Sequence, residues 1–306
     1  MRNIEYPTIE IVCPLKDRQF TIDRYLQGIY NLDYPKDKIS IHWLLNDSTD
    51  LTQSYLKDFK MKHSNEYAEI KIDKIKLGKH KDTRFEANSS TPRFDTYHRL
   101  SALRNYLLDT ATTDYIFSID SDIIVPSNAL KDLLSANVDY ISAVVNNDSI
   151  NRPNETYPNI RTNVLRWRLN GSPDMVEHWL DFPLNEIIEV GCTGAVMLLS
   201  KKAYTSARFG FDCQGEDVFL CRELRDKGIK IYAHTGVWCE HIMVEYQKCC
   251  LDGCQNPCVI LNTDKGQIRI GKFKYEHGKI YPDILVCPNK NKQTNDKIFI
   301  KTKNMS

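Results

Sequence analysis

The 306-residue sequence lacks long hydrophobic runs, because no apolar stretch reaches the roughly 18 residues that a membrane-spanning helix needs. It also lacks an excess of charge, since 41 Lys and Arg stand against 40 Asp and Glu. The bulk charge therefore gives no argument for a nucleic-acid or membrane partner. The first residues contain no apolar segment typical of a secretory leader. We accordingly expect a cytoplasmic protein without a membrane span.

The composition is that of an ordinary globular domain, with 42% hydrophobic and 26% charged residues. In a cytoplasmic protein, the ten cysteines are expected to be thiols or metal ligands rather than disulfides. Five of them are scattered between Cys13 and Cys239 in apolar surroundings. We expect these five to be small core residues.

Strand-like and helix-like segments alternate through the first 130 residues. The apolar residues of the first helical segment recur at helical spacing, at Ile22, Tyr25, Leu26 and Ile29. Strand-like segments occupy residues 8–14, 38–45, 68–77 and 114–119. We expect Thr21 and Ser48 to cap the helices that follow the first two strands. The alternation predicts an α/β domain with a Rossmann-like, mostly parallel central sheet and helices on both faces.

The second half of the chain is less regular. Residues 186–204 place small side chains inside an apolar run, which indicates a close approach to the backbone. A helix is expected at 215–228 and a strand at 229–242, ending near His241. From residue 243 the chain is rich in Lys, Asn and Cys, so we divide it into a domain of residues 1–242 and a small Cys-rich extension of residues 243–306.

The stretch "FSIDSDIIVP" places two acids, Asp120 and Asp122, directly after a strand. In parallel sheets, ligands bind beyond the carboxyl ends of the strands. Two carboxylates there suit a hard cation such as Mg²⁺ or Mn²⁺ and a pyrophosphate. An isolated pair of this kind is also common in solvated turns. The interpretation as a site gains weight from Glu216 and Asp217 at a helix start and from His241 after an apolar strand.

In this order, the segments resemble the nucleotide-diphospho-sugar glycosyltransferases of the GT-A fold, both the large family 2 and the Anp1-type mannosyltransferases. The resemblance is carried by residues 11–29, 44–52, 100–130, 189–204 and 215–241. It covers most of residues 8–242 and leaves the extension unmatched. It implies a metal-dependent glycosyltransferase that transfers a hexose from a UDP- or GDP-sugar to an acceptor hydroxyl.

The resemblance also implies roles for individual residues. Asp122 and His241 would hold the Mn²⁺ or Mg²⁺, and Asp217 would act as the general base. Glu216 would orient Asp217 or hold the acceptor. A small-residue strand that includes Cys192 would pass under the donor sugar. The implied donor-binding residues are Pro14, Asp47, Arg104, Asn105, Asp120, Gly191, Thr193 and Gly194.

Several alternatives stay open. Family 2 enzymes invert the anomeric configuration and Anp1-type enzymes retain it; we expect inversion by a single displacement. A nucleotidyltransferase is disfavoured, because no Gly-rich, basic triphosphate loop follows the first strand. A non-catalytic module that binds a nucleotide-sugar or zinc is the other alternative. The sequence does not specify the acceptor, which can be a glycan, a protein, a lipid or a modified DNA base; the segments 78–94 and 146–180 are candidates for binding it.

The extension contains a cysteine cluster in "CCLDGCQNPC". Its thiols belong to Cys249, Cys250, Cys254 and Cys258, and Cys287 lies downstream. Thiolates suit tetrahedral Zn²⁺, although this spacing is not that of a common zinc finger. A structural Zn²⁺ that orders the extension, free thiols and disulfides therefore remain three interpretations.

Overall fold

A computed structural model describes residues 6–78, 92–145, 147, 162–169 and 174–242, together with the backbone of four strands between residues 259 and 283. Backbone contacts divide the chain into two units, Met1–Glu245 and Tyr246–Ser306. The boundary that we expect after residue 242, between a catalytic domain and an extension, stays a prediction. No helix in the described parts of the chain is long and apolar enough to cross a bilayer.

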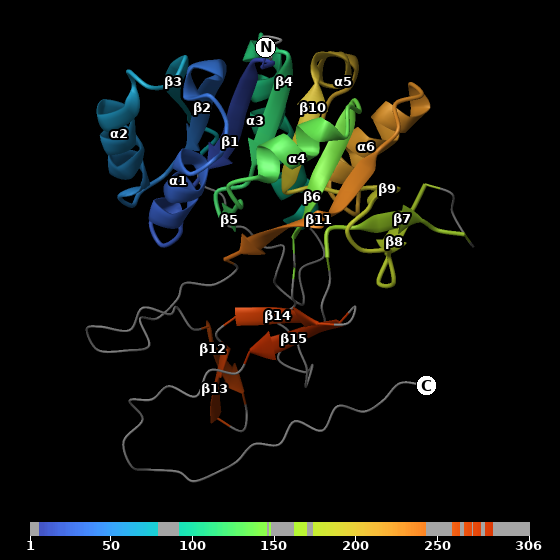
Figure 1. The fold of residues 1–306 in the computed structure, drawn as a ribbon. Helices are drawn as coiled ribbons and strands as arrows, with labels where there is room; N and C mark the ends of the chain where they lie inside the picture. The colour runs from blue at the N-terminus through green and yellow to red at the C-terminus, as the bar shows by residue number, and fades with distance from the viewer. Residues whose placement is uncertain are drawn as a thin grey trace, which may run out of the picture. The chain divides into compact units, whose positions relative to one another are not determined.

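A mixed sheet with the strand order β3-β2-β1-β4-β10-β6-β11-β5 forms the centre of the larger unit, and β9 pairs with β11 (Figure 1). Its strands are β1 Ile9–Leu15, β2 Ile39–Asn46, β3 Glu69–Ile75, β4 Tyr115–Ile119, β5 Ile123–Ile124, β6 Tyr140–Val145, β9 Ile187–Glu189, β10 Val196–Ser200 and β11 Tyr232–His241. A separate hairpin consists of β7 Leu165–Trp167 and β8 Val176–His178. The helices are α1 Ile22–Tyr30, α2 Thr52–His63, α3 Pro92–Thr110, α4 Ala129–Ser135, α5 Lys201–Ser206 and α6 Glu216–Asp226, and a 3₁₀ turn covers Lys36–Lys38.

The direction of the strands differs in part from the mostly parallel sheet that we expect. Strands β1 to β4 pair in parallel, and so do β6 and β11. Strand β10 lies antiparallel between β4 and β6, and β5 and β9 pair antiparallel with β11. A parallel neighbour needs a crossover connection, usually a helix. Among the described residues between β6 and β10 there is a hairpin and no helix, so β10 returns in the opposite direction.

Two hydrophobic clusters cover the two faces of the sheet, as the alternation along β1 predicts. Ile9, Ile11 and Cys13 belong to a cluster that includes residues of α1, α2 and α4. Val12, which points to the other face, belongs to a cluster with residues of α3, α5 and α6. Phe117 at the centre of β4 is fully buried, and burying such a side chain contributes about 1.5–3 kcal/mol.

Neither of the two expected caps makes a side-chain hydrogen bond to the start of its helix, although Thr21 does occupy the N-cap position of α1. The Ser48 hydroxyl accepts a hydrogen bond from the distant backbone N–H of Asp17 at 3.1 Å, and it does not cap α2. Instead, the Asp50 carboxylate accepts from the Thr52 N–H at 3.0 Å. Thr21 does precede α1, but its hydroxyl donates to the Ser121 carbonyl oxygen at 2.8 Å and so ties α1 to the acidic turn. Long-range partners outcompete the local caps at both positions.

The cysteines separate into three groups. Cys13, Cys192, Cys221 and Cys239 are buried free thiols, as expected. Cys213 is exposed, so the expectation of a core position is wrong for this residue, which lies in the loop before α6. The cluster Cys249, Cys250, Cys254, Cys258 and Cys287 lies outside the described residues. In the smaller unit, the structure describes two antiparallel hairpins, β12 Val259–Thr263 with β13 Gly266–Ile270 and β14 Lys272–Glu276 with β15 Lys279–Asp283.

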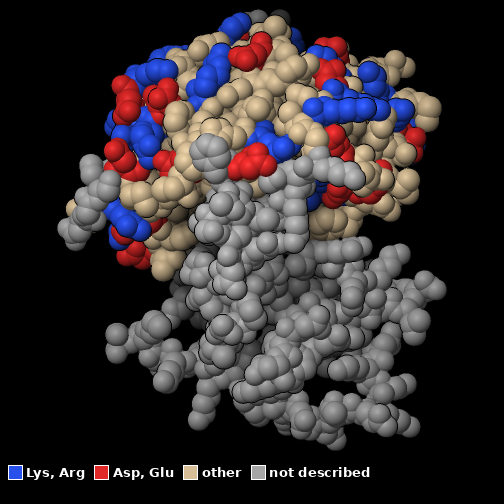
Figure 2. Space-filling view, turned by 180° about the vertical axis from the view of Figure 1, so that it is seen from behind, with Lys and Arg blue, Asp and Glu red and all other residues tan. Residues whose placement is uncertain are grey.

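The surface of the larger unit matches its balanced composition. On the face seen in Figure 2, Lys and Arg side chains lie among Asp and Glu side chains. Charges of both signs are therefore intermixed on this face.

Candidate functional site at the carboxyl edge of the sheet

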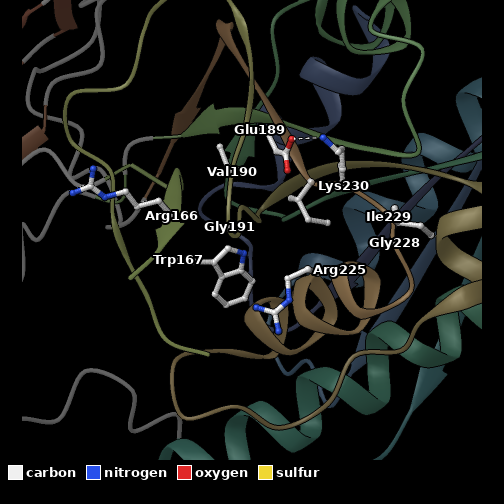
Figure 3. Close-up of a pocket in the computed structure, with 10 residues that line it drawn as sticks. Arg166, Trp167, Glu189, Val190, Gly191, Arg225, Gly228, Ile229 and Lys230 are labelled. Carbon is white, nitrogen blue, oxygen red and sulfur yellow. Dashed lines mark hydrogen bonds and ion pairs between the residues drawn. The ribbon is translucent and has the colours of Figure 1, made fainter. Parts of the chain in front are cut away.

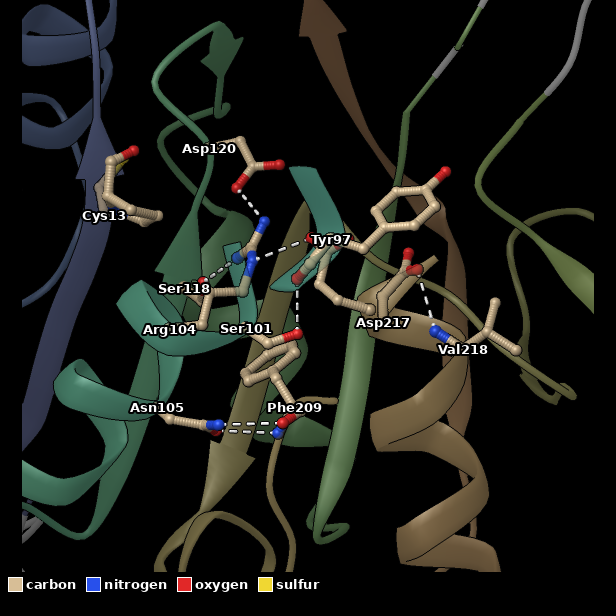
Figure 4. A network of polar contacts seen from close by, with 12 residues as sticks. Cys13, Tyr97, Ser101, Arg104, Asn105, Ser118, Asp120, Phe209, Asp217 and Val218 are labelled. Carbon is tan, nitrogen blue, oxygen red and sulfur yellow. Dashed lines mark hydrogen bonds and ion pairs between the residues drawn. The ribbon is translucent and has the colours of Figure 1, made fainter. Parts of the chain in front are cut away.

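A buried arginine joins the acidic turn to the helix that carries the second acidic pair. Arg104 in α3 is only 7% exposed, and its Nη2 donates to Asp120 Oδ1 at 2.8 Å. Its Nη1 donates to Ser118 Oγ at 3.3 Å (Figure 4). Its Nε donates to Glu216 Oε1 at 3.3 Å. Burial lowers the pKa of Arg104, but the charges of Asp120 and Glu216 outweigh it and raise that pKa overall. The guanidinium is therefore a fixed positive charge between two motifs.

Asp217 follows Glu216 in the first turn of α6 and has the acidity expected of a base. Burial, followed by the charge of Glu216, raises its pKa to about 7 against the opposing charge of Arg104. One carboxylate oxygen accepts from the Val218 N–H at 2.9 Å (Figure 4). A carboxylate that titrates near neutral pH is suited to remove a proton from a hydroxyl group.

Two glycines leave room for the Asp217 carboxylate. A Cβ on Gly194 would lie 2.4 Å from Asp217 Oδ2, and a Cβ on Gly215 would lie 2.4 Å from Oδ1. Gly215 also has a φ of +149°, which favours glycine. The close approach that the small residues of 186–204 predict is thus made by a catalytic candidate.

The second half of the acidic turn faces the end of β11. Asp122 Oδ1 lies 3.7 Å from His241 Nε2, and Oδ2 lies 3.7 Å from Arg18 Nη2. The Ile242 N–H donates to the Asp122 carbonyl at 2.8 Å, which holds the two segments together. Burial raises the pKa of Asp122, but the contact with His241 and the charges of His241 and Arg18 outweigh burial and lower it overall.

Asp122 and His241, the two residues expected to bind the metal, lie close together. His241 Nδ1 lies 3.0 Å from Asn147 Oδ1, which can accept a hydrogen bond from it, and His241 Nε2 faces Asp122. In metal sites, a hydrogen bond to the ring nitrogen that does not bind the metal orients the ligating histidine. Neighbouring ligands of a small divalent cation lie about 3 Å apart, and the 3.7 Å between Asp122 and His241 is close to this spacing. Within the described residues, no group of three or more His, Cys, Asp or Glu side chains forms a metal site.

Two of the residues expected to bind the donor lie at the ends of the first two strands. Pro14 pairs with Leu44 near the end of β1. Asp47 follows β2 with a φ of +48°, and its Oδ2 accepts from the Leu77 N–H at 2.9 Å. The roles of Pro14 and Asp47 in binding a nucleotide base stay predictions.

Three other expected donor residues make internal contacts. The Asn105 amide donates to the Phe209 carbonyl at 2.9 Å and accepts from its N–H at 2.8 Å (Figure 4). Thr193 is fully buried, and its hydroxyl accepts from Asn163 at 3.0 Å. Gly191 lies against β7, where a Cβ would be 2.6 Å from the Trp167 nitrogen.

Sequence reasoning missed three residues that support the site. Arg18 contacts Asp122 from the loop after β1, and Asn147 orients His241. Asn163 is 4% exposed and donates to the Gly194 carbonyl at 2.8 Å, beneath Asp217. A cation shortly after the first strand was a usable signal for Arg18. The two asparagines belong to a polar, turn-rich segment in which nothing distinguishes them from their neighbours.

The sequence profile of the Anp1 family matches residues 3–170, more than half of the chain. The chain belongs to the Anp1 family. Anp1 is a glycosyltransferase family, so the resemblance seen in the sequence is confirmed. The matched range of this Anp1 chain includes the acidic turn and Arg104 but ends before α6 and β11.

Two known proteins resemble this Anp1 chain over part of their length. A procollagen-lysine,2-oxoglutarate 5-dioxygenase from Drosophila melanogaster is 26% identical over 218 residues, which are 69% of this chain and 26% of that protein. A glycosyltransferase 25 family member from Anopheles gambiae is 24% identical over 153 residues, 48% of this chain and 25% of that protein. The chain thus spans about a quarter of the length of these curated relatives.

Among solved structures, the mannosyltransferase PcManGT from Pyrobaculum calidifontis, in complex with GDP-Man and Mn²⁺, is similar with a TM-score of 0.50. It is 16% identical in sequence, and the match covers 80% of this chain and 59% of that one. The likeness confirms the expected GT-A fold.

Proposed function

We propose that this Anp1-family chain is a glycosyltransferase that transfers the sugar of a UDP- or GDP-sugar to an acceptor hydroxyl. One observation carries the proposal: three separate motifs meet in one site. Arg104 connects Asp120 to Glu216, beside Asp217, while Asp122 faces His241. This site lies at the carboxyl edge of the sheet, where α/β proteins bind ligands. The complex of PcManGT with GDP-Man and Mn²⁺ supports this choice of donor class.

The metal-binding part of the proposal rests on Asp122 and His241, which would hold Mn²⁺ or Mg²⁺. When bound, such an ion neutralises the charge that develops on the leaving nucleoside diphosphate. Arg18, 3.7 Å from Asp122, brings a further positive charge to the same side. We infer that Arg18 binds donor phosphate oxygens, because a guanidinium matches phosphate geometry well.

Asp217 is the proposed general base. The acceptor oxygen forms a bond to the anomeric carbon while the bond from that carbon to the diphosphate oxygen breaks. The acceptor proton passes to the Asp217 carboxylate, and the electron pair of the broken bond leaves with the nucleotide. Because the pKa of Asp217 is about 7, a substantial fraction of the protein has this carboxylate ionised at neutral pH. Glu216, bonded to Arg104, orients this first turn of α6.

A retaining reaction is the second candidate, because the Anp1-type mannosyltransferases that the chain resembles retain the anomeric configuration. The raised pKa of Asp217 favours inversion, since a base is needed only to activate the acceptor in a single displacement. The anomeric proton of the first-formed product, observed by NMR before mutarotation, distinguishes the two reactions.

A panel of UDP- and GDP-sugars tests the proposal, with release of free nucleotide as the readout in the presence of Mn²⁺. We expect release with at least one donor and its loss in Asp122→Ala. Asp33→Ala is the matched control, because Asp33 is an exposed acid paired with Lys131 on α4. Donor binding without any nucleotide release, with or without added acceptors, would instead support a non-catalytic module.

A further inference from the structure

A hollow lies at the opposite end of α6 from Asp217. It has a volume of about 480 Å³ and is lined by β7, residues 189–191, the last turn of α6 and residues 228–231 (Figure 3). Asp217 and Arg225 are eight residues apart on this helix, so about 12 Å separates them along its axis. None of the residues proposed for proton transfer or metal binding lines the hollow, and of the residues expected to bind the donor only Gly191 does.

An indole forms one wall of this hollow. The Arg225 guanidinium lies over the Trp167 ring, 4.4 Å from its centroid, and so covers one face of the indole, while the ring also lines the hollow. Gly191 permits this arrangement, because any larger residue would collide with the Trp167 backbone. Apolar residues also line the hollow, namely Val190, Ile229 and Ile231.

The charged groups at the rim are balanced. Lys230 bonds Glu189 at 2.7 Å, and Arg166 bonds Glu177 at 2.9 Å. Arg225 bonds both Asp174, at 3.2 Å, and Asp226, at 3.1 Å. Every cation that lines the hollow is thus paired with a carboxylate, so the rim offers no surplus positive charge for a phosphate or sulfate. It offers hydrogen-bond donors and acceptors held in place by ion pairs.

A second hollow of about 320 Å³ adjoins the first. The two share Gly228, Ile229 and Lys230, and the second adds Tyr115 and Tyr232 together with polar groups at residues 137–139. Together the two hollows form what we name the Trp167 groove. Sites for small ligands typically measure about 300–1,000 Å³, so each hollow is large enough for a ligand unit.

A sugar ring has an apolar face of C–H groups, and hydroxyl groups lie around its edge. The apolar face matches the apolar part of the lining, to which Trp167, Val190 and Ile229 contribute, and the hydroxyls match the charged donors and acceptors of the rim. We propose that the Trp167 groove is a non-catalytic binding site for a neutral oligosaccharide, with sugar units in both adjoining hollows. This site goes beyond the proposed transfer reaction, because none of the steps of that reaction requires it.

Calorimetric titration of the full chain with maltotriose, cellotriose, mannotriose and chitotriose tests the inference. We expect at least one of these to bind, and we expect Trp167→Leu to weaken its binding by about tenfold or more, equivalent to about 1.4 kcal/mol. Lys230→Ala, a change at an exposed position, should weaken binding several-fold without affecting folding. Lys131→Ala, which removes an ion-paired lysine on α4, should leave binding unchanged.

Two further measurements separate this inference from the proposed enzyme function and from charge-driven binding. Asp217→Asn should bind the trisaccharide as tightly as the unaltered protein. Loss of turnover in this variant would therefore leave the inference about the Trp167 groove intact. A sulfated trisaccharide should bind no better than its neutral counterpart. The inference is overturned if no neutral trisaccharide binds, if Lys230→Ala and Trp167→Leu both bind normally, or if sulfation dominates affinity.

Discussion

Gly194 lies directly against the Asp217 carboxylate, so that a Cβ at position 194 would be 2.4 Å from Oδ2. The two residues belong to different elements, the segment before β10 and the first turn of α6. Because Gly194 has no side chain, the Asp217 carboxylate can pack directly against its backbone. This contact fixes the position of the proposed base. Several consequences of this and related contacts can be measured.

The substitution Gly194→Ala should displace the Asp217 carboxylate and reduce turnover by about 10²-fold, since small misplacements of catalytic groups have effects of this size. Affinity for the donor with Mn²⁺ should change little. Gly28→Ala is the control, because a Cβ at position 28 would have its closest neighbour at an ordinary 3.5 Å. Normal turnover in Gly194→Ala would contradict the assignment of Asp217 as base.

The pH dependence of kcat/KM should report the ionisation of Asp217. Because the active form is the carboxylate and its pKa is raised to about 7, kcat/KM should rise with pH and level off above neutrality. Asp217→Asn should lose about 10²–10⁴-fold in turnover together with this pH-dependent limb. If the residual kcat/KM of Asp217→Asn still rose with pH in the same way, the ionisation would belong to another group.

The stability of the folded protein should respond to the same ionisation. Folding raises the pKa of Asp217 from 3.8 to about 7, so the folded protein binds a proton more tightly than the unfolded chain. The associated stability is present below pH 3.8 and is lost as the pH rises through about 7. In urea unfolding, Asp217→Asn should therefore gain stability relative to the unaltered protein between pH 5 and pH 8. An equal difference at the two pH values would speak against the raised pKa.

Removal of the Arg104 side chain should destabilise the fold. Arg104→Ala would leave the Glu216 carboxylate buried without its partner, and breaking a buried pair in this way costs about 3–5 kcal/mol. Arg208→Ala breaks an exposed pair with Asp109 and should cost less than about 1 kcal/mol. Urea unfolding measures the free energy of unfolding of both variants. An equal loss in the two would show that the buried contacts of Arg104 stabilise the fold no more than an exposed ion pair does.

The contact between Asn147 and His241 should matter for metal affinity. Loss of the group that orients a ligating histidine typically weakens metal binding by about 10–100-fold. We therefore expect Asn147→Ala to weaken Mn²⁺ binding by at least about tenfold. The EPR signal of free Mn²⁺ in a titration measures this affinity. Asn128→Ala, at an exposed site before α4, is the control. Unchanged Mn²⁺ affinity in Asn147→Ala would remove His241 from the set of proposed ligands.

Local sequence patterns were sufficient for part of the fold. The helical spacing of Ile22, Tyr25, Leu26 and Ile29 gives α1, and the strand before Asp120 is β4. Periodicity decides these elements because it reflects which neighbouring side chains share a face. The same reasoning failed at Ser48, whose hydroxyl has a better partner in Asp17, 31 residues away.

The sequence by itself determined the α/β class and the positions of the acids at a strand end and a helix start, since both follow from short-range spacing and order; the GT-A fold was expected from a family resemblance. Only the tertiary structure decided that Arg104 bonds Glu216, 112 residues further along, that Gly194 lies against Asp217, and that Trp167 and Arg225 line a second groove. These contacts depend on how strands and helices pack in three dimensions, and no pattern within a short window of sequence encodes such distances.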